Sequence, residues 1–248
     1  TKAWDAVGSL LWSDSEGVLH RHFRGHSGVP GQLDDHAFML WAAVELHQAT
    51  LDEKYLKGAE FLAEAALAWF GDGGKGQGFY MTRKGVEVPT RPQIVWDGAI
   101  PSGNSAMMLS LARLARLLGH AEWEDRVHGV LQGLSGSITQ TPEGHSLALV
   151  AADYLMGPSV EVHLVYKEHA QDVLPFLEAL HRQYRPNVAV ARHRHMEGGY
   201  FFAPTGFSRD CGADSVAIAY ACRDFSCEAP VCEPEALEAI VDGSNTGG

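Results

Sequence analysis

The sequence is short of basic residues and has no long apolar run. Its 19 lysines and arginines face 31 aspartates and glutamates, which gives a net charge of −12 at pH 7. Such a charge repels phosphate backbones and anionic lipid surfaces, so we expect neither a nucleic acid nor a membrane as a partner. A membrane-spanning helix needs about 20 consecutive apolar residues, and no run approaches that length. We therefore expect a soluble protein and, because the first residues lack the apolar stretch of a signal peptide, a cytoplasmic one.

Cysteine is also scarce, and all four cysteines lie in the last quarter of the chain, at Cys211, Cys222, Cys227 and Cys232. Zinc sites usually offer two ligand pairs with short internal spacing, and this sequence meets that pattern only at its loose edge. We therefore expect no metal and no cofactor. Buried or loop thiols are the leading interpretation, and a disulfide between two of the four stays open.

The rest of the composition is that of a globular protein, with 46% hydrophobic and 20% charged residues in a chain of 248. An apolar segment that opens with Asp34, Asp35 and His36 begins again at Ser102, so that Asn104 stands where Asp35 stood. Four apolar residues recur unchanged: Ala37, Met39, Leu40 and Ala43 match Ala106, Met108, Leu109 and Ala112. Such a repeat is typical of arrays that stack helical hairpins around one core.

Apolar periodicity predicts two hairpins, each with an inner and an outer helix. Residues 33–49 and 105–118 are apolar on nearly every side, as in helices enclosed by others. Residues 54–70 and 122–134 carry one apolar stripe and one charged face, as in helices with one wet side. Another inner helix is expected at residues 145–154.

The later segments predict a small α/β unit. Strands at 160–166 and 188–190 flank a helical pattern at 170–184. Residues 215–222 suggest a further strand, and residues 233–241 a last helix.

The predicted fold is mainly α: a partial (α/α)6 toroid of helical hairpins over residues 1–156. An α/β segment with a closing helix of the same domain follows over 157–242, and 243–248 form a flexible tail. Between the two hairpins, the glycine-rich residues 71–78 end the helical pattern, and residues 79–89 suggest a short β-hairpin.

The inner helices of a toroid direct their ends at a central cavity, so the residues that open them are candidate site residues. These candidates combine carboxylates, an amide, a hydroxyl and aromatic faces: Asp34, Asp35 and His36 at the first helix, Asp97, Ser102 and Asn104 at the second, and Phe79, Tyr80 and Trp96 beside them. The mixture suits a sugar, whose hydroxyls need polar partners and whose C–H faces need aromatic platforms. Asp35 and Asp97 are the candidate general acid-base residues.

Structural interpretations stand beside these functional ones. Asp34 and Ser102 are favoured N-cap residues, His36 suits a packed position at the rim, and Phe79 and Trp96 suit the core.

Arg91 could clamp an anionic substrate group, but an ion pair, for example with Asp97, is the default for a lone loop arginine. Two loose groups of histidines are expected on solvated loops: His20, His22 and His26, and His193 and His195.

Four ordered motifs carry a family resemblance. They are GQLDDHAF at residues 31–38, GFYMT at 78–82, DGAIPSGNS at 97–105 and ACRDFSCEAP at 221–230. With these motifs the chain resembles the spermatogenesis-associated protein 20 family, whose bacterial members are often called thioredoxin domain-containing proteins. The family usually has tyrosine where this chain has His36.

The resemblance implies a longer parent in which a thioredoxin-like domain is the partner of this segment. It also implies a six-hairpin glycosidase-like toroid, similar to that of the sugar epimerases, of which this chain holds only the later part.

Two hypotheses of function follow. In the first, the toroid binds or processes a carbohydrate-like small molecule, as an epimerase or a glycosidase would, and Asp35 and Asp97 act as acid and base. In the second, the chain is a scaffold or binding module, and Cys222 and Cys227 are redox or structural thiols that exchange with the partner domain. Convergence of Asp35, Asp97 and Asn104 on a cavity would favour the enzyme, whereas pairing of the carboxylates with backbone N–H groups would favour the scaffold.

Overall fold

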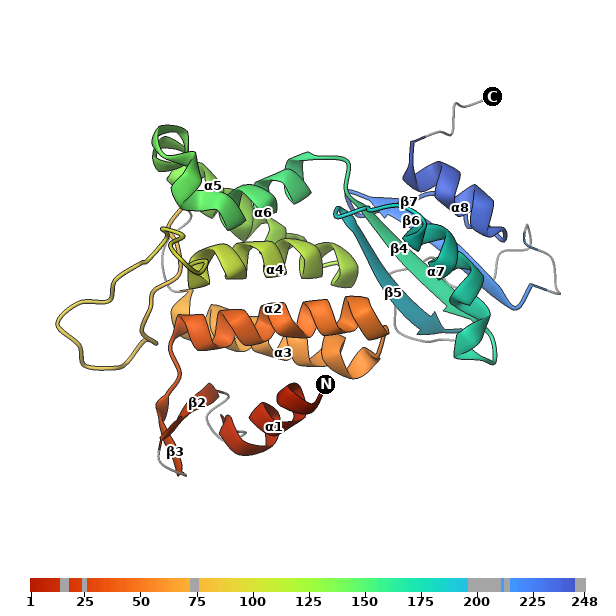
Figure 1. Ribbon diagram of the computed structural model, residues 1–248. Coiled ribbons are helices and arrows are strands. Elements are labelled where there is room, and N and C mark those ends of the chain that lie inside the picture. Colours follow the sequence, from red (N-terminus) through yellow and green to blue (C-terminus); the bar gives the residue numbers. More distant parts are fainter. Residues whose placement is uncertain (14–17, 24–25, 72–75, 196–210, 212–214, 244–248) are drawn as a thin grey trace. The chain divides into compact units, whose positions relative to one another are not determined.

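The computed structural model describes residues 1–13, 18–23, 26–71, 76–195, 211 and 215–243. The chain divides into two compact units: unit 1 is Thr1–Ala115 with Glu122–Leu155, and unit 2 is Arg116–Ala121 with Met156–Gly248. The fold is mainly α with a small mixed sheet, which confirms the predicted class at that level (Figure 1).

Unit 1 begins with a helix and a small antiparallel sheet. Their bounds are α1 (Lys2–Leu11), β1 (Trp12–Ser13), β2 (Val18–Phe23) and β3 (His26–Pro30), in the strand order β1-β2-β3. The expectation of loops around His20, His22 and His26 is therefore wrong, because these residues lie on β2 and β3.

Helical hairpins make up the rest of unit 1. The elements are α2 (Leu33–Thr50), α3 (Glu53–Phe70), α4 (Gly103–Leu118), α5 (Ala121–Gln140), the 3-10 turn η1 (Pro142–His145) and α6 (Ser146–Met156). The turn between α2 and α3 needs only Leu51, in the left-handed region at φ 53°, and Asp52, which caps α3 by accepting a hydrogen bond from the Lys54 backbone N–H.

The inner and outer roles are as the apolar pattern predicts in the second hairpin, α4 and α5, whereas α2 buries only one stripe and is not enclosed as predicted. Helix α4 is enclosed along most of its length, with Met107, Met108 and Leu111 fully buried. Helix α3 instead buries one stripe: Tyr55, Leu56, Ala59, Leu62, Ala63, Ala66 and Phe70. Burial of these apolar side chains is the main driving force for the packing of unit 1.

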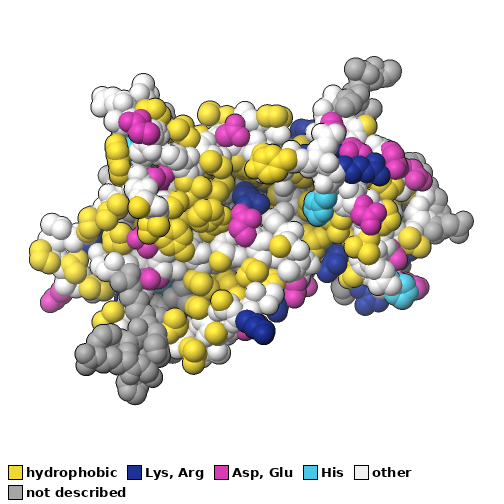
Figure 2. Space-filling view, viewed as in Figure 1, with side chains coloured by type: hydrophobic (Ala, Val, Ile, Leu, Met, Phe, Trp, Pro, Cys, Tyr) yellow, Lys and Arg dark blue, Asp and Glu magenta, His cyan; other side chains and the backbone are white. Residues whose placement is uncertain are grey.

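The connection between α3 and α4 has no strand among residues 76–102, so the β-hairpin predicted at 79–89 is wrong. The backbone N–H groups of Tyr80 and Met81 donate instead to the carbonyls of Phe70 and Pro92. Five large hydrophobic side chains of this connection are exposed: Val86, Val88, Ile94, Trp96 and Ile100. Figure 2 shows hydrophobic side chains gathered in several patches over one face of the molecule.

Unit 2 is the predicted α/β unit. Its elements are β4 (Val160–Tyr166), the 3-10 turn η2 (Ala170–Val173), α7 (Leu174–His181), β5 (Val188–Arg194), β6 (Ala217–Arg223), β7 (Ser226–Cys227) and α8 (Pro234–Val241). The sheet order is β5-β4-β6-β7, in which β4 and β5 are parallel and the other pairs are antiparallel.

Helices α7 and α8 pack together, and α8 also contacts β6 (Figure 1). Arg185 ties the end of α7 to α8, because its Nε lies 2.8 Å from Asp242 Oδ1 and its Nη2 lies 3.1 Å from Glu238 Oε1. Within the described part of the chain, no helix has the length and apolarity that crossing a membrane requires.

Truncating a core leucine of α4 tests this account of unit 1. We expect Leu111→Ala to lower the free energy of unfolding by about 2–5 kcal/mol, because it removes fully buried methyl groups and leaves a cavity. Urea denaturation measures the difference. The matched control is Leu149→Ala on α6, whose side chain is exposed and which should change the free energy by much less. Equal losses in the two variants would contradict the assignment of α4 as the inner helix.

Candidate functional site

The carboxylates that open α2 bind backbone N–H groups. Asp35 Oδ2 accepts a hydrogen bond from the Gln32 N–H at 2.7 Å, as part of a capping box. Asp34 Oδ1 accepts from the Gly103 N–H at 3.1 Å, which joins the start of α2 to the start of α4. Both carboxylates therefore satisfy donors that helix geometry would otherwise leave unpaired.

Asp97 forms a similar bridge between two other helix ends. Its Oδ1 accepts from the Ser102 N–H and its Oδ2 from the Leu147 N–H, each at 2.8 Å. These groups lie at the N-terminal ends of α4 and α6, where the helix dipoles also favour a negative charge. The Asp97 side chain is buried, and its own backbone N–H donates to the Gly144 carbonyl at 2.8 Å.

Asn104 fixes the connection that leads into α4. Its Oδ1 accepts from the Phe79 N–H at 2.5 Å, and its Nδ2 donates to the carbonyls of Phe79 and Ile94 at 3.0 and 2.8 Å. Gly78 allows this approach, since a Cβ atom there would lie 2.5 Å from Asn104 Oδ1. Ser102 joins the same group of residues through a hydroxyl–hydroxyl bond to Ser105 at 3.0 Å.

The aromatic and basic candidates are placed by other contacts. Arg91 donates from Nε and Nη2 to the Thr82 carbonyl at 3.0 and 2.8 Å, and its guanidinium lies 4.3 Å from the centre of the Tyr80 ring. The buried His36 ring shares a hydrogen bond with the Gln32 carbonyl at 3.0 Å.

Phe79 and Trp96 differ in exposure. Phe79 is fully buried, whereas Trp96 is 49% exposed and meets the His145 ring edge to face at 5.5 Å. Trp96 therefore has surface to offer a ligand and Phe79 has none, while Tyr80 is half-buried.

The structure brings Asp34, Asp97, Ser102 and Asn104 together at the start of α4, as the sequence suggests. Their hydrogen-bond partners include backbone groups of unit 1, as expected for a structural role. The catalytic assignment of Asp35 and Asp97 remains a prediction.

A second group of chemical side chains lies in unit 2. All four cysteines are oxidised, in the pairs Cys222–Cys227 and Cys211–Cys232. Cys222 and Cys227 are direct cross-strand partners of β6 and β7, with Cα atoms 3.9 Å apart. Cys222 is buried, whereas Cys227 is half-buried, so the two residues differ in their exposure to solvent. The leading expectation of free thiols is wrong, and the disulfide that was left open is present.

Strand register places two residues of the central strand β4 in one row with these cysteines. Glu161 on β4 is the partner of Cys222 on β6, and His163 is the partner of Tyr220. Residues two apart on a strand share a face, so Glu161, His163, Tyr220 and Cys222 lie on one face of the sheet. Arg116 reaches the same row, with its Nη1 3.8 Å from Glu161 Oε1.

A histidine pair lies beside this row. His163 Nδ1 and His193 Nε2 are 3.1 Å apart, and the two rings stack with their centres at 5.3 Å. Burial lowers the pKa of His163 to about 4 and raises the pKa of Tyr220 above its usual value. The expectation of a solvated loop at His193 is wrong, because His193 lies on β5.

Sequence reasoning missed Glu161, His163 and His193 as site residues. The period-2 pattern of residues 160–166 already places Glu161 and His163 on one face. It could not show that Cys222 and His193 would lie beside them, because strand pairing is not visible in one sequence.

The fold and these sites define a class: helical hairpins with polar caps in one unit, and a small mixed sheet with two disulfides in the other. The chain is 24% identical to human spermatogenesis-associated protein 20 over 87% of its own length and 28% of that protein's. It is 24% identical to the rat protein of the same name, over 85% and 27% of the two lengths. A Caenorhabditis elegans protein called uncharacterized protein B0495.5 is also 24% identical, over 96% and 33%.

These similarities confirm the resemblance to the spermatogenesis-associated protein 20 family. No family model matches the chain. The chain spans about a quarter to a third of the length of these relatives.

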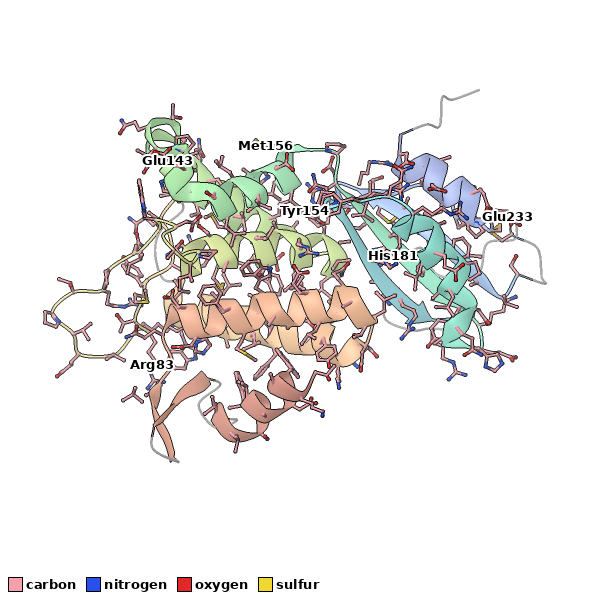
Figure 3. All side chains as sticks on the ribbon, viewed as in Figure 1. Arg83, Glu143, Tyr154, Met156, His181 and Glu233 are labelled. Carbon is pink, nitrogen blue, oxygen red and sulfur yellow. A yellow bond between two sulfur atoms is a disulfide. The ribbon has the colours of Figure 1, made fainter. Side chains whose placement is uncertain are left out.

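Replacing Asp97 separates a capping role from a catalytic one. We expect Asp97→Asn to lower the free energy of unfolding by about 1–3 kcal/mol, because an amide has one acceptor oxygen where two N–H groups, one buried and one partly buried, need one each. Chemical denaturation measures this loss. The control is Glu143→Gln at the exposed turn η1, which Figure 3 labels. Unchanged stability combined with lost binding of a saccharide would contradict the capping role and support catalysis.

The histidine pair predicts how stability depends on pH. Because the pKa of His163 falls from 6.5 to about 4 on folding, only the unfolded chain binds this proton between those values. Stability is therefore lost as pH falls from about 6.5 towards about 4, by roughly 3 kcal/mol from this group. Urea denaturation at pH 7 and pH 4.5 should show a smaller difference for His163→Gln than for the wild type. His181→Gln, at an exposed position of α7 (Figure 3), should behave as the wild type does; if His163→Gln does so too, His163 is not the group responsible.

Proposed function

We propose that the chain is a scaffold and binding module with a redox function, in which the Cys222–Cys227 disulfide accepts electrons from the dithiol of a thioredoxin-like partner domain. One observation carries the proposal: the disulfide joins direct cross-strand partners at the end of a hairpin, with the Cys227 side half-buried and the Cys222 side buried. An attacking thiolate can therefore distinguish the two sulfurs by access.

The partner dithiol is the only reductant that the exchange needs. A partner thiolate attacks Cys227 Sγ, the bond between the two sulfurs breaks, and Cys222 leaves as a thiolate that takes a proton. The second partner thiolate then attacks its own neighbour in the mixed disulfide, which releases Cys227. The two electrons move from the partner dithiol, which becomes a disulfide, to Cys222 and Cys227, which become thiols.

A purely structural role explains the Cys222–Cys227 disulfide less well than it explains Cys211–Cys232. Cys222 and Cys227 are separated by 5 residues, and Cys211 and Cys232 by 21. In the chain-entropy account, closing the shorter loop contributes about 1 kcal/mol less to stability. The pairing of β6 with β7 also fixes the hairpin that the shorter disulfide closes.

In this proposal the helical hairpins of unit 1 provide the scaffold. The carboxylates and the amide that could have done chemistry hold helix ends and the α3–α4 connection in place. The hairpins would form part of a six-hairpin toroid whose other members lie outside this chain. Because the chain spans only about 28% of the human relative, the activity of a whole parent protein is part of the same proposal.

Carbohydrate binding or processing is the second candidate function. Trp96 supports it, because its indole is half-exposed and belongs to the exposed apolar side chains of the α3–α4 connection. Trp96 also directly precedes Asp97 in the sequence. An aromatic face next to a carboxylate is a usual platform for a sugar ring. In that case Asp35 and Asp97 would have to leave their backbone partners during the reaction.

Graded reduction tests the redox proposal. We expect dithiothreitol to open Cys222–Cys227 before Cys211–Cys232, because closing the shorter loop stabilises the folded chain less. Rapid alkylation followed by peptide mass spectrometry identifies the thiols at each step. The Cys222→Ser, Cys227→Ser double variant serves as the control, since it should remove the early thiols and leave the late ones. Early opening of Cys211–Cys232 would contradict the proposal.

A further inference from the structure

We infer that unit 1 holds a binding pocket for a small, uncharged aromatic molecule of about two fused rings, with walls formed by Trp4, Trp12 and Phe61. The pocket lies between α1, β1, α2 and α3 (Figure 1). None of its described lining residues belongs to the Cys222–Cys227 disulfide or to the polar groups at the start of α4. The pocket is therefore independent of the proposed exchange, and either can fail without the other.

Aromatic and apolar side chains form the walls of this pocket. Its lining includes Trp4 and Gly8 of α1, Trp12 of β1, Met39 of α2, and Gly58 and Phe61 of α3. The Trp12 and Phe61 rings meet edge to face, with their centres 4.9 Å apart. The Trp4 ring meets Tyr55 of α3 in the same way at 5.8 Å, so α1 is held against the α2–α3 hairpin by ring contacts.

Two glycines make room for the pocket. A Cβ atom at Gly58 would lie 2.8 Å from Trp4 Cζ2, so glycine lets the indole lie this close to α3. At Gly8, by contrast, no described atom lies within 4 Å of a Cβ atom placed there. Glycine inside a helix is less stable than alanine, and the packing of α1 does not require it at this position. The open space beside Gly8 belongs to the pocket that this residue lines.

The pocket is open to solvent. Phe61 is 47% exposed, and Gly8 is exposed as well, whereas Leu62, the next residue of α3 and also part of the lining, is buried. A large aromatic side chain that stays exposed beside a concave apolar surface is typical of ligand-binding grooves. A ligand can therefore reach the pocket directly from solvent.

Volume and lining chemistry define the ligand. The pocket measures about 220 Å³. A closed apolar cavity of about 150 Å³ takes up benzene, so this pocket has room for about two fused rings. None of its described lining side chains carries a charge, so a charged ligand would lose hydration without gaining a partner. The aromatic walls favour a flat ring, because aromatic rings attract one another in edge-to-face and offset-stacked contacts.

An indole ring has this size and chemistry, and it occurs both as a free molecule and as the side chain of tryptophan. The pocket has room for the ring system and not for a peptide backbone besides it. The ligand assigned to it is therefore the free molecule.

The test measures the binding of 5-fluoroindole to the whole chain by fluorine NMR. We expect saturable binding that unlabelled indole and naphthalene displace. Gly8→Leu should weaken the binding about tenfold or more, because its side chain occupies the open space without a clash. A tenfold change corresponds to about 1.4 kcal/mol, roughly the contribution of two buried methylene groups.

Gly136→Leu is the matched control. Gly136 is also an exposed glycine inside a helix, α5, with no described atom within 4 Å of a Cβ atom placed there, and it is not among the lining residues. This variant should bind 5-fluoroindole as the wild type does.

Phe61→Ala tests the wall of the pocket instead of its space. We expect it too to weaken the binding about tenfold, because it removes one of the three aromatic rings. Since Phe61 is half-exposed, the variant should fold, which urea denaturation checks. It decides the question if Gly8→Leu does not fold.

Three results would overturn the inference. The first is no saturable binding of 5-fluoroindole to the wild type. The second is binding of equal strength to the wild type, Gly8→Leu and Phe61→Ala, which would place the ring elsewhere on the chain. The third is binding of a tryptophan-containing peptide without binding of 5-fluoroindole, which would assign the pocket to a protein segment.

Discussion

The backbone N–H groups at buried helix ends set the chemistry of unit 1. A helix leaves its first N–H groups without partners inside the helix; the start of α4 is buried, and the starts of α2 and α6 are partly buried. Asp35 caps α2, Asp34 reaches from α2 to the start of α4, and Asp97 serves α4 and α6 together. A carboxylate used in this way holds several helices at once, and removing it would leave buried donors unpaired. The polar residues predicted as site residues thus also serve this packing.

In unit 2, unlike unit 1, the packing does not require the polar residues that it contains. On the central strand β4, an apolar residue would satisfy the packing at every buried position, as Val165 does. Glu161 and His163 depart from that solution and lie in a row with Tyr220 and the Cys222–Cys227 disulfide. Burial of ionisable groups in such a row is costly for stability, so packing alone does not account for them. We propose unit 1 as the scaffold and unit 2 as the site of the exchange.

The sequence predicted the helices better than the sites. Periodicity identified α2 to α5, the strand Val160–Tyr166 and the start of β5, which runs to Arg194 beyond the predicted 188–190, because amphipathic patterns are local. It missed β2 and β3, and it predicted a hairpin after α3 where the chain pairs with distant segments. The polar groups near α4 were found by motif, yet their backbone partners were not. The Glu161–Cys222–Cys227 row depends on strand pairing between distant segments, which no single-sequence pattern reports.

The most direct test of the account is to trap the mixed disulfide. A thioredoxin-like partner whose second cysteine is replaced by serine cannot complete the exchange, so the first intermediate accumulates. Peptide mass spectrometry of the adduct identifies the attacked sulfur. The account predicts an adduct on Cys227 with Cys222 released as a thiol. An adduct on Cys211 or Cys232, or none after extended incubation, would contradict it.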